Sequence, residues 1–427
     1  MSWQPTAALL RVSLLPAALA VLAVLTRRPD LLVVAAPLAL AAVPLVRRPA
    51  GRPGARLGIG EPAVAEGATV RATVGLADVA GAQTATVVLS TPEWVRPAAG
   101  GRLASVVRPG RSDAVDVEVQ LLARRWGRST VGPATVTLSA CGGLLRAGPE
   151  TLAAARLQVL PLSARYTGVD LLPRTRAAVG LHRSPRAGEG SELTGIRPFG
   201  PGDRIRRINW RTSLRTDQLQ VNATTTERDA GVHLLLDARY DGGTSGGVGG
   251  ASSGIDIAVR ATAALTACYL GLGDRVALTT TTGTMRTVPA RSGRGQLERV
   301  LAALLDTSAP RAGGPEPQLP VPPDLDPRAL VLVVSPLVGR YVFEQAATVA
   351  RSGHPVVVVD TLPPDAALPD DDRWAAPVTA LWRLERSTRI GQLTDLGVPV
   401  VGWQGAGTLD TVLRELTRAA ARAGGRR

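Results

Sequence analysis

The sequence predicts a multidomain protein with an N-terminal transmembrane helical hairpin, a β-sandwich, and an α/β domain built on a mostly parallel sheet. Two apolar runs lie close to the N-terminus, and short alternating strands separated by Gly and Pro follow them. Further along, buried-strand patterns alternate with helical patterns. The predicted segments are the hairpin with a basic linker (1–56), the sandwich (57–165), an Arg/Gly-rich segment (166–226) and the α/β domain (227–427).

The hairpin prediction depends on the length of the two apolar runs. Val12 to Leu25 is uncharged, and it extends back to Ala7 with only Arg11 inside it. At 1.5 Å per residue this run reaches roughly the ~30 Å of a bilayer core. A second run, Leu31 to Val46, follows a short turn. Two such spans would place both ends of the pair on one side of the membrane.

The arginines around the two runs predict which side that is. Arg11 precedes the hairpin and four arginines follow it, whereas the turn carries Arg27 and Arg28 beside Asp30. Positively charged flanks favour the cytoplasm. We therefore expect a cell-membrane protein with two N-terminal spans and a cytoplasmic body. A cleaved signal peptide followed by a buried helix is the alternative.

The composition limits the class of protein to which this chain can belong. The chain has 427 residues, of which 45% are hydrophobic and 20% charged, as is typical of globular domains. The net charge is +14 and every basic residue is Arg, which is typical of a GC-rich genome. Two cysteines and three histidines are scattered along the chain, so neither a disulfide framework nor a zinc site is expected.

The predicted sandwich has strands that alternate apolar and polar residues. A scaffold role is expected for this part of the chain. Its strands are predicted at Thr69–Val74, Thr84–Leu89, Ala114–Leu122, Thr135–Leu138 and Arg156–Leu160.

In the predicted α/β domain, apolar strands alternate with amphipathic helices. Ligands in such sheets bind at the carboxyl ends of the strands, and Asp237 ends the first strand. The strands are expected at Val232–Asp237, Arg275–Thr280, Leu330–Val334, Val356–Val359 and Val398–Trp403. The helices are expected at Ile255–Leu270, Gln296–Leu305, Tyr341–Arg351, Ala375–Ile390 and Leu409–Ala423.

A dense motif occupies the Arg/Gly-rich segment. Its distinctive residues are His182, Ser184, Gly190, Glu192, Arg197, Pro201, Gly202, Asp203, Arg207, Asn209 and Trp210. This motif resembles the signature of the domain of unknown function 58 family, and the stretch Arg125 to Pro133 fits the same family. Two positions depart from it. Ala140 to Leu144 replaces the family's Asp-Pro-Phe-Gly-Leu, and Asn209 stands where the family often has Asp.

The resemblance implies a membrane-anchored chain with a von Willebrand factor A-like domain. It also implies a partner, a MoxR-type AAA+ ATPase. Domains of the von Willebrand type hold a metal ion with Asp-x-Ser-x-Ser, but this chain has Arg239 and Asp241 at the two serine positions. We therefore expect a degenerate site and no cofactor. Weak Mg²⁺ binding by Asp237 and Asp241 is the alternative.

The motif also has a physical interpretation of its own. Asp203 could cap a helix from Arg204 to Leu214, with Ile205, Ile208 and Leu214 facing inward and Trp210 serving as a packing anchor. The motif would then form either an interdomain joint or a partner-docking surface. Only two aromatic residues accompany its arginines, which argues against nucleic-acid binding.

These observations favour a non-enzymatic, membrane-anchored adaptor that binds a protein partner in the assembly or maturation of other complexes. One alternative is an Arg-mediated binder of nucleic acid or another anionic polymer. Another is a cryptic hydrolase using His182 and nearby acids. The client protein and the oligomeric state are left open by the sequence.

Overall fold

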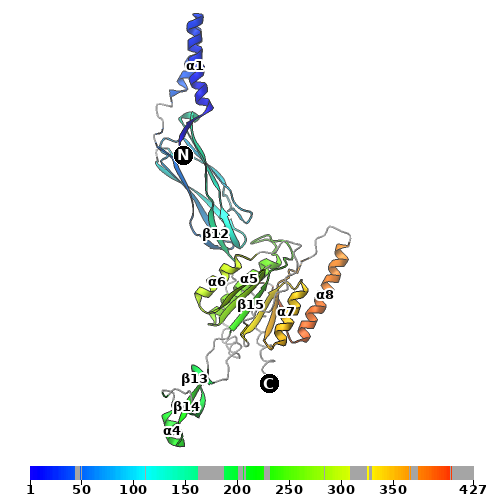
Figure 1. The fold of residues 1–427 in the computed structure, drawn as a ribbon. Coiled ribbons are helices and arrows are strands. Elements are labelled where there is room, and N and C mark those ends of the chain that lie inside the picture. Colours follow the sequence, from blue (N-terminus) through cyan, green and yellow to red (C-terminus); the bar gives the residue numbers. More distant parts are fainter. Residues whose placement is uncertain are drawn as a thin grey trace. The chain divides into compact units, whose positions relative to one another are not determined.

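The computed structural model describes residues 1–43, 49, 51–110, 112–161, 187–200, 205, 208–225, 231–282, 284–307, 325–326, 329–364, 366, 374–403 and 405. The chain divides into two compact units, Met1–Leu160 and Pro161–Arg427. Each is described by itself. Within the described residues, one N-terminal helix is long and apolar enough to cross a membrane, and the strands form several sheets of mixed strand direction (Figure 1).

The first unit begins with a short strand and two apolar helices. These elements are β1 (Trp3–Pro5), α1 (Ala7–Thr26) and α2 (Asp30–Leu40). Of the helices that the structure describes, only α1 is long and apolar enough to cross a membrane, which by itself is weak evidence of anchoring. The second run was expected to extend to Val46, but α2 ends at Leu40, and residues 44–46 lie outside the described residues. Pro44 has no N–H to donate to the carbonyl of Leu40, so a continuous helix would lose a hydrogen bond at that point.

The rest of the first unit is β-structure around one apolar core. A five-stranded sheet has the order β1-β11-β10-β5-β7, a four-stranded sheet the order β2-β4-β8-β6, and a three-stranded sheet the order β3-β12-β9. Buried side chains from all three sheets, such as Val74, Leu138 and Leu157, belong to a single cluster. The sequence pattern found β5 with its observed bounds. It missed β2, β11 and the shorter strands; Gly148 and Pro149 interrupt β11, and strands of three to five residues are too short to show a period.

The elements of this body are β2 (Gly54–Ile59), β3 (Ala63–Ala65), β4 (Thr69–Ala77), β5 (Thr84–Leu89), β6 (Val95–Pro97), β7 (Ala104–Val107), β8 (Ala114–Ala123), β9 (Gly127–Val131), β10 (Ala134–Ala140), the 3₁₀ turn Cys141–Gly143, β11 (Leu145–Leu152) and β12 (Ala155–Leu160).

The second unit contains a six-stranded sheet of order β17-β16-β15-β18-β19-β20. All neighbours are parallel except β17, which forms an antiparallel hairpin with β16. Successive residues of β15 and β18 are buried, so both faces of the sheet are covered. In Figure 1, α7 and α8 lie side by side beside this sheet.

The elements of this part are β15 (Gly231–Asp237), α5 (Gly254–Gly271), β16 (Arg275–Thr282), β17 (Thr284–Arg291), α6 (Arg294–Leu304), β18 (Leu330–Ser335), α7 (Arg340–Arg351), β19 (Val356–Asp360), α8 (Ala375–Asp395) and β20 (Val400–Gly402). The sequence did not predict β17. The final helix expected at Leu409–Ala423 lies outside the described residues.

A small module precedes this sheet in the chain. It consists of β13 (Ala187–Pro198), α4 (Trp210–Thr216) and β14 (Gln220–Thr225), with the two strands paired antiparallel. Ile208 forms an isolated bridge to Val221, which ties the residues before α4 to β14. We refer to these elements together as the signature module.

Candidate functional site: the carboxyl edge of the sheet

The strand order places a topological switch point between β15 and β18. The next strand in sequence after β15, β16, lies on one side of it, and β18 lies on the other. Ligands of open α/β sheets bind where the order reverses in this way, beyond the carboxyl ends of the strands. Asp237 ends β15 and Ser335 ends β18, so the predicted acid does lie at this position.

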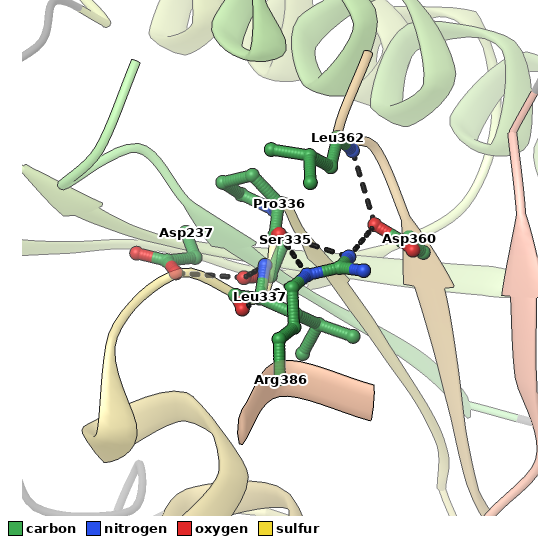
Figure 2. Close-up of polar contacts among 7 residues, drawn as sticks. All are labelled: Asp237, Ser335, Pro336, Leu337, Asp360, Leu362 and Arg386. Atoms are coloured by element: carbon green, nitrogen blue, oxygen red, sulfur yellow. Dashed lines mark hydrogen bonds and ion pairs between the residues drawn. The ribbon is translucent and has the colours of Figure 1, made fainter. Parts of the chain in front are cut away.

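Side chains of the two neighbouring strands form hydrogen bonds around the Asp237 carboxylate. The hydroxyl of Ser335 donates to Oδ2 of Asp237 over 2.7 Å, as Figure 2 shows. The Thr281 hydroxyl donates to the carbonyl of Leu236 at 3.1 Å and lies 3.5 Å from Oδ1 of Asp237. Three strands thus contribute to one buried polar cluster.

Arg239 neutralises this carboxylate. Its Nε donates to Oδ1 of Asp237 over 2.9 Å, and both side chains are only 3% exposed. The guanidinium carbon also lies 4.5 Å from the ring centre of Tyr341 and 5.8 Å from that of Tyr240. A buried cation of the chain itself therefore lies against the acid that a metal ion would need as a ligand.

A second pair closes the neighbouring strand end. Asp360 ends β19, and its Oδ1 lies 2.5 Å from Nη2 of Arg386 on α8 (Figure 2). The backbone N–H of Leu362 donates to the same oxygen over 3.0 Å. Arg386 also donates to the carbonyls of Pro336 and Leu337 at 3.1 and 3.2 Å, so it joins the ends of β18 and β19.

The loop after β18 has a strained backbone at this point. Leu337 is fully buried with φ +52°, a left-handed conformation that disfavours a branched side chain. Its N–H donates to the Ser335 hydroxyl over 2.9 Å, while its carbonyl accepts from Arg386. Ser335 and Arg386 therefore hold the strained residue in place.

Asp241, the second carboxylate considered for a metal, has a different role. Its Oδ1 accepts the N–H of Ile255 in the first turn of α5 over 3.0 Å. Ser253 and Asp256 form a capping box at the same helix end. Asp241 therefore stabilises the start of α5. In the described part of the chain, no three His, Cys, Asp or Glu residues are grouped as a metal would need.

His233 is the buried histidine nearest this cluster in sequence. Its Nε2 lies 2.8 Å from the hydroxyl of Thr279 on the neighbouring strand. Burial, with a further contribution from the charge of His354, lowers the pKa of His233 to about 4. The ring is therefore neutral at pH 7 and serves packing. His182, considered for a hydrolase, and Ser184 of the motif lie outside the described residues.

The remaining motif residues are placed only in part. Gly190 and Glu192 belong to β13, and Arg197 is exposed on the same strand. Pro201, Gly202, Asp203 and Arg207 lie outside the described residues.

The helix of the motif is shorter than expected and has a different cap. It begins at Trp210, and the Asn209 side chain accepts the N–H of Thr212 over 3.1 Å. Asn209 also donates to the side chain of Asn222 at 2.9 Å. Asn serves as a cap as well as Asp does, and it supplies a donor that Asp lacks.

Three side chains of this helix region contradict the predicted packing. Trp210 was expected to anchor it, yet its side chain is 59% exposed. Ile205 and Leu214 are also exposed, and only Ile208 is buried. The reason is that the side of α4 toward β14 is polar. The Ser213 hydroxyl accepts the N–H of Gln220 over 2.8 Å and donates to the carbonyl of Asn209.

A comparison with known protein families matches part of the chain to the same family that the motif resembles. Residues 195–376 match the family described as "Protein of unknown function DUF58". This is less than half of the chain, and it covers most of the signature module and the sheet as far as the start of α8. Uncharacterised proteins of Mycobacterium bovis and of two strains of Mycobacterium tuberculosis are each 29% identical over 231 residues. The alignments cover 52% of this chain and 68% of each relative.

Proposed function

We propose that this protein is a non-enzymatic, membrane-anchored adaptor that binds a protein partner, a MoxR-type AAA+ ATPase, in the assembly or maturation of other complexes. The observation that carries the proposal is the closed carboxyl edge of the sheet. Where an α/β enzyme holds its ligand, this chain places the buried pair of Asp237 and Arg239 and the pair of Asp360 and Arg386.

The strand order and the position of Asp237 support a von Willebrand factor A-like domain that has lost its metal site. In such a domain a metal ion bridges to a partner's carboxylate. Here a buried arginine neutralises the acid, so partner binding would use another surface. This part of the proposal rests on the resemblance and on the geometry around Asp237.

The N-terminal strand supports anchoring by an uncleaved hairpin. Trp3 to Pro5 pairs with β11, and the Thr6 hydroxyl donates to the carbonyl of Gly143 over 2.8 Å. Residues on both sides of α1 and α2 therefore belong to the same body. A chain that crosses the membrane after Pro5 must return before β2, and the flanking arginines favour a cytoplasmic body.

Isolation of the full-length protein from native membranes tests the adaptor proposal. We expect an AAA+ ATPase to copurify, and to do so equally well with the double variant Arg239→Met/Asp237→Asn, because both side chains are buried and no unpaired charge remains. Recovery of salt-sensitive nucleic acid in place of an ATPase would overturn the proposal. Protease added outside intact cells should leave the body undigested. Digestion would reverse the orientation and remove access to a cytosolic ATPase.

A further inference from the structure

The signature module exposes large apolar side chains on α4. Trp210 and Leu214 are one helical turn apart and therefore lie on one face of the helix. Leu214 is 85% exposed and Ile205 is 71% exposed. Among the described residues outside α1 and α2, no other large apolar side chain is as exposed as these two. Trp210 and Leu214, both exposed on one face of α4, indicate an interaction site, whereas Ile205 precedes the helix.

This exposed face is rigidly supported. The Asn209 side chain caps the helix and bonds to Asn222, and the backbone N–H of Asn209 donates to the carbonyl of Gln220 over 2.8 Å. Ser213 is buried and ties the opposite side of α4 to β14. These polar bonds fix the helix with Trp210 and Leu214 on its exposed side. A partner would therefore bind with a smaller loss of conformational entropy.

Two arginines form a parallel stripe beside the apolar one. Arg211 and Arg215 follow Trp210 and Leu214 by one residue each, which places them about 100° further around the helix. Both are exposed, and neither has an acidic partner within the described residues. Arg215 lies in the last turn of α4, where positive charge favours the helix, whereas the repulsion between like charges four residues apart opposes it slightly.

From these observations we infer that the Trp210–Leu214 face, with Arg211 and Arg215 beside it, docks an acidic amphipathic helix of a partner protein. Apolar residues of that helix would cover Trp210 and Leu214, and its carboxylates would pair with the two guanidinium groups. Trp and Arg are the residue types that contribute most at protein interfaces. This inference rests on the adaptor function proposed above and assigns it a surface.

Charge and size favour this occupant over two others. A second copy of the chain carries the same net charge of +14 and would be repelled from a basic face. A membrane surface is a poorer fit, because α4 spans seven residues and binding of a helix to lipid increases with buried apolar area.

The exposed apolar stripe of α8 differs from the signature module in its charges. Trp374, Val378, Leu381 and Leu384 are exposed there. The arginines on α8 already have partners, however. Arg386 binds Asp360, Arg389 binds Glu385, and Arg383 donates to the carbonyl of Ala366. This stripe therefore provides a matched control of similar apolar character, in which each arginine already has a hydrogen-bond partner.

The test uses the full-length protein in phosphatidylcholine nanodiscs and a fluorescent peptide. The peptide is a designed helix with one Leu/Trp face and Glu on the other face, and a scrambled peptide of equal composition is its control. We expect saturable binding by fluorescence anisotropy at low salt. Leu214→Glu should weaken it at least about tenfold, the effect of one interface anchor. The control Leu381→Glu, at a side chain 67% exposed on α8, should leave it unchanged.

Charge reversal makes the test specific. Arg211→Glu together with Arg215→Glu should lose the acidic peptide and gain a peptide in which Arg replaces Glu. Equal binding of the scrambled peptide, equal loss with Leu381→Glu, or no binding by the wild type would overturn the inference. So would Leu214-dependent sedimentation with phosphatidylglycerol vesicles in the absence of peptide binding, which would assign the face to lipid.

The same variants separate this inference from the adaptor proposal. If the ATPase copurifies equally with the wild type and with Leu214→Glu, the adaptor stands and this docking surface is wrong. If the peptide binds as expected but no ATPase is recovered, the surface stands and the identity of the partner is wrong. An unchanged thermal unfolding curve for Leu214→Glu shows that the variant is folded.

Discussion

Arginine has opposite surroundings at the carboxyl edge of the sheet and in the signature module. At the sheet edge, Arg239 is 3% exposed and lies against a carboxylate and two aromatic rings. In the module, Arg211 and Arg215 are exposed beside apolar side chains that are themselves uncovered. The first arrangement satisfies its charges internally, whereas the second leaves both charge and apolar surface available to a partner.

The site predicted from the fold, at Asp237, and the proposed docking face of α4 differ in this respect. Position in the fold points to Asp237, because switch points of parallel sheets bind ligands. The contacts show that this position is closed by the chain itself. The module has no comparable fold-based signal, yet it exposes large apolar side chains beside two arginines. Changes at the sheet edge should therefore act on stability, and changes on the module's outer face should act on binding.

The largest effect is expected from removal of the buried cation. Arg239→Met leaves the Asp237 carboxylate buried without its charge partner, and it should lower the free energy of unfolding by about 3–5 kcal/mol. Chemical denaturation of the full chain in detergent measures this. The double variant Arg239→Met/Asp237→Asn should recover part of the loss, because no buried charge remains. A loss below about 1 kcal/mol for Arg239→Met would mean that water reaches the carboxylate.

Acidification should weaken the buried part of the sheet as well. The pKa of His233 is about 4 in the folded protein, against an ordinary value of 6.5. Between these pH values the unfolded chain binds a proton that the folded protein excludes, so stability falls as the pH falls from 6.5 to 4. The total loss is about 3 kcal/mol. Unfolding measured across this range should show the slope in the wild type, and His233→Gln should flatten it.

A smaller loss is expected at the second ion pair. Arg386 and Asp360 are 14% and 19% exposed, so water compensates part of any change. Arg386→Gln also removes hydrogen bonds to the carbonyls of Pro336 and Leu337, and should cost about 1–3 kcal/mol. Arg389→Gln, which removes an exposed pair with Glu385 on the same helix, should cost less than about 0.5 kcal/mol. Equal losses for both would contradict a joining role for Arg386.

The α/β elements could be predicted because their signals are local. Buried strands such as Val356–Asp360 are continuous apolar runs, and α5 combines helical spacing with a Ser cap. The acid at the end of β15 followed from the same pattern. By the same logic Asp360 at the end of β19 could have been found, since it is also an acid ending a buried strand.

Other features depend on distant contacts that no local pattern contains. Strand β1 has three residues and pairs with β11, far along the chain. Arg386 reaches the ends of two strands from α8, and nothing in its neighbourhood marks it among many arginines. Trp210 was predicted to be a packing anchor, but the polar bonds of Ser213 and Asn209 fix α4 with the opposite side inward.

Within the module, the Asn209 cap is expected to contribute modestly to stability, and only to that of α4. Asn209→Ala removes the acceptor for the N–H of Thr212 and the bond to Asn222, and should cost about 1 kcal/mol. The loss should be confined to α4 and seen as faster hydrogen exchange at the amide of Thr212. Asn209→Asp keeps the acceptor, so the amide of Thr212 should exchange more slowly in this variant than in the Ala variant. Unchanged exchange in Asn209→Ala would show that other bonds hold the outward face of Trp210.

The smallest effect is expected from magnesium, and it tests the closed edge most directly. The Arg239 guanidinium donates to Oδ1 of Asp237, and Oδ2 accepts from Ser335, so neither oxygen is open to an ion. Millimolar MgCl₂ should therefore give no binding heat in calorimetry and no shift in thermal unfolding. Arg239→Ser recreates Asp-x-Ser-x-Asp around Asp237 and Asp241. That variant should be stabilised by the same salt, because an ion can then replace the lost cation. Wild-type binding tighter than millimolar, abolished by Asp237→Ala, would instead show that Arg239 moves aside and that the sheet edge is an open metal site.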